Sequence, residues 1–92
     1  MVYESGTPIN LTASGTLCVT DCTILGFYVN STSSGVVNFK TGAAGASTGT
    51  AISGSITPAI GFHRFPAACP AGAYMTVVSG TINVTVFVKT GA

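Results

Sequence analysis

Residues 81–89 decide the fold class, and they read Thr81-Ile82-Asn83-Val84-Thr85-Val86-Phe87-Val88-Lys89. Aliphatic side chains occupy every second position, with polar side chains and one phenylalanine between them. This period of two fits a β-strand and does not fit a helix, whose apolar period is about 3.6 residues. The stretch therefore predicts a strand with one buried aliphatic face.

The rest of the chain repeats the pattern in shorter form. Apolar runs alternate with Ser, Gly, Thr and Pro at intervals of roughly 8–12 residues, a spacing typical of all-β sandwiches and barrels. The predicted strands are residues 7–12, 16–19, 22–30, 36–41, 51–58, 61–66, 73–78 and 81–89. No connection is long enough for a parallel crossover, so we expect antiparallel pairing. The predicted fold is an antiparallel, jelly-roll-like β-sandwich of seven or eight strands with no substantial helix.

Glycine and serine mark the predicted turns. Residues 31–35 are expected to form a polar turn, and Ser79-Gly80 a tight turn that makes residues 73–78 and 81–89 a hairpin. Residues 42–49 read Gly-Ala-Ala-Gly-Ala-Ser-Thr-Gly. Such small residues hold a fixed backbone only at a high entropic cost, so we expect an exposed, mobile Gly/Ala loop.

Length and composition limit the classes of function. The chain has 92 residues, of which 47% are hydrophobic and only 5% charged. Three Lys and Arg residues are too few for an electrostatic nucleic-acid binder. Two acidic residues leave little material for acid–base catalysis or a calcium site. Because no apolar run is long enough to span a bilayer, we expect no membrane association.

The length predicts a single domain over residues 1–92, in which residues 1–6 form a flexible N-terminal arm. These first residues lack the basic and apolar regions of a secretion signal. We therefore expect synthesis in a cytoplasm.

The three cysteines are Cys18, Cys22 and Cys69. If residues 19–21 form a three-residue hairpin loop, Cys18 and Cys22 lie opposite each other and a disulfide is sterically allowed. Cytoplasmic synthesis favours the alternative of free thiols. A zinc site built from the cysteines and His63 would need two tight ligand pairs, and the chain offers one loose pair. We therefore expect no metal and no other cofactor.

Catalysis is not expected. A Ser-His-acid triad would have to use His63, the single histidine, but no Gly-x-Ser-x-Gly sequence marks a nucleophile. We expect His63 and its neighbour Arg64 at a surface or interface.

Residues 22–30 carry apolar side chains in both phases of a strand. Leu25, Phe27 and Val29 are expected on the inner face, and Ile24 and Tyr28 on the outer face. Outward apolar groups with few charges around them predict packing against another subunit. The candidate interface residues are Ile24, Tyr28, Phe87, His63 and Arg64. A homo-oligomer, first of all a trimer, is expected because a domain of this size has a modest core.

Three stretches, residues 25–35, 56–66 and 80–87, resemble small β-rich virion proteins of tailed phages, namely head decoration (cement) or fibre-like structural proteins. The resemblance covers most of the chain from Gly15 onward. It implies a capsid decoration protein, made in the host bacterial cytoplasm, that binds the major capsid protein on the virion surface. A fibre, tail or baseplate module is the alternative. The predicted fold class leaves a sugar-binding adhesin domain open as well.

Overall fold

Residues 81–89 are extended as predicted, and they form the last part of a strand of 18 residues. A computed structural model describes residues 7–46 and 48–90, so the predicted arm of residues 1–6 lies outside the described part. The strands are β1 (Thr7–Leu11), β2 (Gly15–Cys18), β3 (Cys22–Thr41), β4 (Thr50–Ala51), β5 (Gly61–Cys69) and β6 (Ala73–Thr90), with a short 3₁₀ turn, η1 (Ala43–Gly45). All pairings between these strands are antiparallel, which confirms the predicted all-β antiparallel class.

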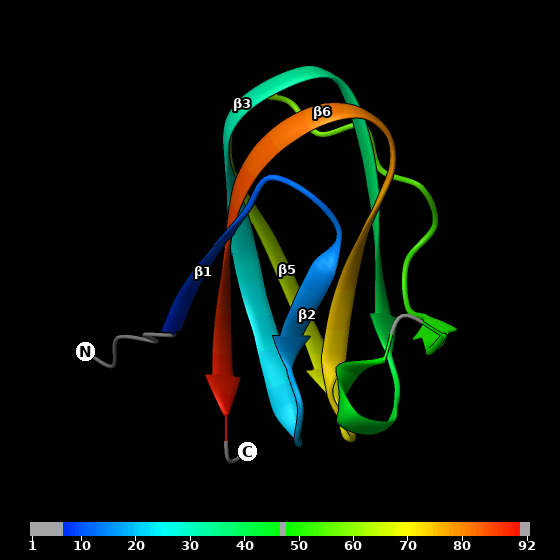
Figure 1. The fold of residues 1–92 in the computed structure, drawn as a ribbon. Coiled ribbons are helices and arrows are strands. Elements are labelled where there is room, and N and C mark those ends of the chain that lie inside the picture. Colours follow the sequence, from blue (N-terminus) through cyan, green and yellow to red (C-terminus); the bar gives the residue numbers. More distant parts are fainter. Residues whose placement is uncertain (1–6, 47, 91–92) are drawn as a thin grey trace, which may run out of the picture.

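The two longest strands, β3 and β6, pair with each other from Cys22↔Thr90 to Thr41↔Ala73. They arch together at the middle of their lengths (Figure 1). The predicted turn at residues 31–35 and the predicted hairpin at Ser79-Gly80 are therefore wrong. The chain bends there instead: Ser34 and Gly80 have φ of 55° and 72°, and the register shifts on both sides of Val36. Such bulges bend a strand without ending it.

This continuity lowers the strand number to six, because β3 and β6 each contain two of the predicted strands. The predicted strand 51–58 is also shorter than expected. It consists of β4 and, further along, one isolated bridge between Val37 and Ile56. The described strands belong to one hydrogen-bonded sheet. The jelly-roll-like sandwich stays a prediction.

The bend divides the sheet into two parts. The first half-sheet has the strand order β1, β6 (residues 81–90), β3 (residues 22–33) and β5. The second half-sheet has the order β2, β6 (residues 73–79), β3 (residues 36–41) and β4. Because both long strands fold over, the two half-sheets face each other around the core.

The core fills the space between the half-sheets. The buried aliphatic and aromatic residues of the two long strands, together with Met75, are Ile24, Phe27, Val29, Val37, Phe39, Ala73, Ile82, Val84, Val86 and Val88. The rings of Phe27 and Phe39, one from each half-sheet, meet with centroids 5.3 Å apart. Burial of each of the larger side chains contributes roughly 1.5–3 kcal/mol, so this aliphatic and aromatic layer is the main source of stability.

In the Gly/Ala segment 42–49, four of the seven described residues are exposed, whereas Gly45 is held against β2. Gly45 is buried, and its carbonyl accepts a hydrogen bond of 2.9 Å from the Thr16 hydroxyl. The amide of Ala44 donates to the Ala71 carbonyl over 3.1 Å. A side chain at Gly45 would collide with the Cys18 carbonyl, so the absence of side chains lets this segment pack closely against β2.

Candidate interaction surface

The outward side of the first half-sheet carries two neighbouring rows of side chains. The strand registers place Pro8, Phe87, Gly26 and Arg64 in one row, and Asn10, Thr85, Tyr28 and Phe62 in the next. Residues opposite each other in an antiparallel sheet share a face, so each row lies on one side of the sheet. Four strands thus contribute to one outer surface.

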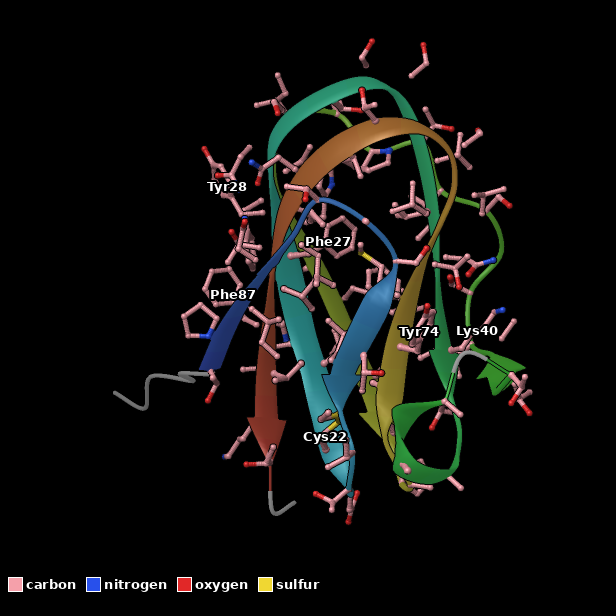
Figure 2. The ribbon with its side chains drawn as sticks, in the orientation of Figure 1. Cys22, Phe27, Tyr28, Lys40, Tyr74 and Phe87 are labelled. Atoms are coloured by element: carbon pink, nitrogen blue, oxygen red, sulfur yellow. A yellow bond between two sulfur atoms is a disulfide. The ribbon has the colours of Figure 1, made fainter. Side chains whose placement is uncertain are left out.

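Three rings on this surface form what we call the aromatic patch: Tyr28, Phe62 and Phe87. Tyr28 is 43% exposed and Phe62 57% exposed, while Phe87 is half-buried. The rings of Phe62 and Phe87 have centroids 6.2 Å apart. Tyr28 and Phe87 point away from the core on the same side of the molecule, whereas Phe27 points inward (Figure 2). The predicted outward positions of Tyr28 and Phe87 are confirmed.

Gly26 lies beneath the aromatic patch and lets the Phe62 ring rest on the sheet. A methyl group at this position would lie 2.8 Å from Cζ of Phe62 and 2.7 Å from the carbonyl oxygen of His63. Contacts this close force atoms to move. The glycine is therefore required first by the His63 carbonyl, which belongs to the backbone of β5, and second by the close approach of the Phe62 ring.

The expectation that Ile24 lies on the outer face is wrong. Ile24 is fully buried, because the register of β3 shifts between Ile24 and Gly26 against both of its neighbouring strands. This bulge reverses the alternation, so Ile24 and Phe27 point to the same side although they are three residues apart. Leu25, expected inside, is half-buried and lines an outer hollow.

His63 and Arg64 occupy different surroundings. His63 is half-buried, with its ring 5.2 Å from that of Phe27 and its Nε2 2.7 Å from the carbonyl oxygen of Ala59. Arg64 is exposed in the outer row beside the aromatic patch. It lines a hollow of about 260 Å³ together with Thr23, Leu25 and Pro66. Of the pair, Arg64 is the residue that can meet a partner at the outer surface.

An amide cluster adjoins the aromatic patch. Asn10 Nδ2 donates to Asn83 Oδ1 over 2.8 Å and to Thr85 Oγ1 over 3.2 Å. Asn30 Nδ2 donates to the same two oxygens over 3.2 and 3.1 Å. These bonds join β1, β6 and β3 across the outer surface, so side-chain amides here support the sheet that carries the rings.

Beyond the amide cluster lies a hydroxyl groove of about 430 Å³, next to the bend of β3 and β6. It is lined by Thr12, Ser31, Thr32, Ser33, Thr81, Ile82 and Asn83. No charged side chain is among these lining residues. The groove therefore offers hydrogen-bonding groups but no electrostatic attraction.

The cysteines gather at the opposite end of the first half-sheet. Cys18 and Cys22 form a disulfide across the turn between β2 and β3, where cytoplasmic synthesis favoured free thiols. Cys69 is a free, buried thiol directly opposite Cys22. Burial raises the pKa of the Cys69 thiol, and hydrogen bonds with the Thr41 side chain and the Ile24 backbone oppose this effect.

The described residues contain no cluster of three or more His, Cys, Asp or Glu side chains that could hold a metal ion. Within the same ranges, none of the helical segments has the length and apolarity needed to cross a bilayer. No protein-family model, curated protein or solved structure matches the chain.

Proposed function

We propose that the chain is a capsid decoration (cement) protein, a structural subunit that binds the outside of a phage head and stabilises the lattice of the major capsid protein. The observation that carries this proposal is the aromatic patch, three rings gathered on the outer face of the sheet. Large exposed apolar groups that lie together are typical of protein–protein contacts. Residues 25–35, 56–66 and 80–87 resemble phage virion proteins, and this resemblance is the reason for proposing the major capsid protein as the partner.

The role is mechanical and involves no catalysis. Tyrosine and arginine are enriched among the residues that dominate binding energy, so Tyr28 and Arg64 are the proposed anchors. A specific contact needs about 1,000 Å² of buried surface, which the outer face can reach only with several strands contributing. Because oligomeric subunits bind at several positions of the shell at once, contacts that are individually weak give strong overall attachment through avidity. Because few charges take part, attachment depends only weakly on salt concentration.

Self-association belongs to the same proposal. The chain acts as a homo-oligomer, first of all a trimer, at the capsid surface after synthesis in the bacterial host. The net charge of +1 supports this, since copies repel each other little.

Copy number in purified particles tests the proposal. Quantitative mass spectrometry of intact virions would give hundreds of copies for a lattice-bound decoration protein. About three to a dozen copies would instead favour a fibre, tail or baseplate module. Absence of the chain from the particle would overturn both virion roles.

A sugar-binding adhesin domain is the second candidate, favoured by the hydroxyl groove beside the amide cluster. Uncharged hydroxyls and amides suit a neutral polyhydroxylated ligand, and Tyr28 offers a ring nearby for stacking. A glycan array separates the candidates. Binding that is lost in an Asn83→Ala variant would support the adhesin, and no binding above background would dismiss it.

A further inference from the structure

Cys22 faces two other cysteines of the chain. It is bonded to Cys18 on one side, and it is the direct register partner of Cys69 across β3 and β5 on the other. Cys22 and Cys69 are both fully buried. Directly opposite residues in an antiparallel pair have Cα atoms about 4.5–5.5 Å apart and side chains on the same face. Disulfides span Cα distances of about 4.4–6.8 Å, so the Cys22–Cys69 position can hold a disulfide without a change of register.

We propose that Cys22 has two alternative disulfide partners, and that the Cys69 thiol exchanges with the Cys18–Cys22 bridge to form a Cys22–Cys69 bridge between β3 and β5. In this step Cys69 loses its proton and its Sγ attacks Sγ of Cys22. The Cys22–Cys69 bond forms, the Cys18–Cys22 bond breaks, and the electron pair leaves on Sγ of Cys18, which takes up a proton. One disulfide and one thiol are present before and after, so no oxidant or reductant is consumed.

Burial makes this exchange intramolecular. Because Cys22 and Cys69 have no exposed surface, an external thiol cannot approach Cys22 in the folded protein, whereas Cys69 already lies beside it. The thiol released by the exchange belongs to Cys18, which adjoins the exposed turn residues 19–21. The exchange thus moves the free thiol from the fully buried Cys69 to Cys18, which is also a core residue but is 9% exposed.

The two bridges constrain the chain differently. The Cys18–Cys22 bridge closes a turn with a sequence separation of 4. The Cys22–Cys69 bridge closes the long segment between residues 22 and 69 and fastens β5 to β3. In the chain-entropy description, a longer closed loop lowers the entropy of the unfolded chain more. The form with the Cys22–Cys69 bridge should therefore have the higher free energy of unfolding. It also tethers the strand that carries Phe62 and Arg64. This inference does not depend on the proposed virion role.

Trypsin separates the two bridges, because cleavage after Lys40, Arg64 and Lys89 leaves Cys18 and Cys22 in peptide 1–40 and Cys69 in peptide 65–89. The full-length protein would first be oxidised to the disulfide form and freed of oxidant. Samples taken over time would be quenched in acid, alkylated under denaturing conditions and digested without reduction. We expect the alkylated residue to change from Cys69 to Cys18 while the total stays at one thiol per chain. At the same time, peptides 1–40 and 65–89 become linked.

Variants at the three cysteines make the assignment specific. Both Cys18→Ser and Cys18→Ala should form the 1–40/65–89 link when the reduced, unfolded chain refolds in a glutathione redox buffer, because the thiols are accessible before folding. Cys69→Ser should form none. Cys22→Ser, the matched control, should lose the link. The proposal is overturned if Cys69 stays the only alkylated residue of the wild type at all times, including in mild denaturant. It is equally overturned if the Cys22→Ser variant forms the link as fast as the wild type.

Discussion

Tyr28 and Phe62 lie directly opposite each other across β3 and β5, and both side chains are exposed. Both rings lie on the side of the sheet that is turned away from the core, and β5 is the edge strand of the first half-sheet. Phe87 extends the pair onto β6, with its ring near that of Phe62. The surface is therefore aromatic across three strands.

Replacing Tyr28 with serine should weaken self-association more than it weakens the fold. The side chain is 43% exposed, so its removal leaves little cavity in the core. If Tyr28 anchors the contact, its loss should weaken the free energy of association by about 2 kcal/mol, which raises the dissociation constant roughly 30-fold. Sedimentation velocity over a concentration series measures this. Val78→Ser is the control, since Val78 is 49% exposed at another part of β6. Equal oligomerisation of the wild type and Tyr28→Ser would remove Tyr28 from the interface.

Replacing Val86 with aspartate should unfold the protein. Val86 is fully buried, and a carboxylate there has no partner and little access to water. The free energy of unfolding should fall by more than about 4 kcal/mol, which is a large part of the stability of a small domain. Circular dichroism and urea unfolding would show it. Thr81→Asp, at an exposed position of the same strand, should stay folded. A folded Val86→Asp protein would mean that the faces of β6 are reversed.

A methyl group at Gly26 should disturb the aromatic patch. Gly26→Ala places Cβ against Cζ of Phe62 and the His63 carbonyl, a clash that should cost roughly 1–3 kcal/mol. The matched control is Gly54→Ala, because nothing lies within 4 Å of a Cβ built at Gly54. Thermal unfolding of both variants gives the comparison. If the two variants melt at the same temperature, the Phe62 ring does not rest on Gly26.

Stability should fall at alkaline pH because of Cys69. Its raised pKa means that the unfolded chain loses the thiol proton first, at a pH of about 8.5. The contribution of the Cys69 thiol to the free energy of unfolding is complete below that pH, and it is lost as the pH rises through the pKa of the thiol in the folded protein. Urea titrations in a Cys18→Ala/Cys22→Ala background, which has no bridge to exchange, should show a steeper fall for the protein that keeps Cys69 than for the one that also carries Cys69→Ala. Identical slopes would show that the thiol ionises equally in both states.

The sequence predicted the parts of the fold that depend on side-chain alternation. Ile82, Val84, Val86 and Val88 are buried as the period of two required. The bends of β3 and β6 were not predictable, because glycine and serine serve equally in a tight turn and in a bulge, and only the pairing partner decides between them. The true strands are therefore fewer and longer than the pattern indicated.

The candidate surface was predicted in part. Tyr28, Phe87 and Arg64 lie on it, whereas Ile24 does not, because a bulge after Ile24 reverses the faces of β3. Phe62 was not among the predicted interface residues. The alternation of residues 61–66 placed Phe62 on the same face of the strand as Arg64. Its position opposite Tyr28, however, depends on the pairing of β3 with β5, which local sequence does not encode.

High-resolution imaging of purified particles tests the central claim, that the aromatic patch is where this subunit meets its neighbours. The account predicts density for the chain at regular positions on the head lattice, with Tyr28, Phe62 and Phe87 covered by an adjoining protein. A head lattice without this chain, or a bound chain whose three rings face solvent, would contradict it.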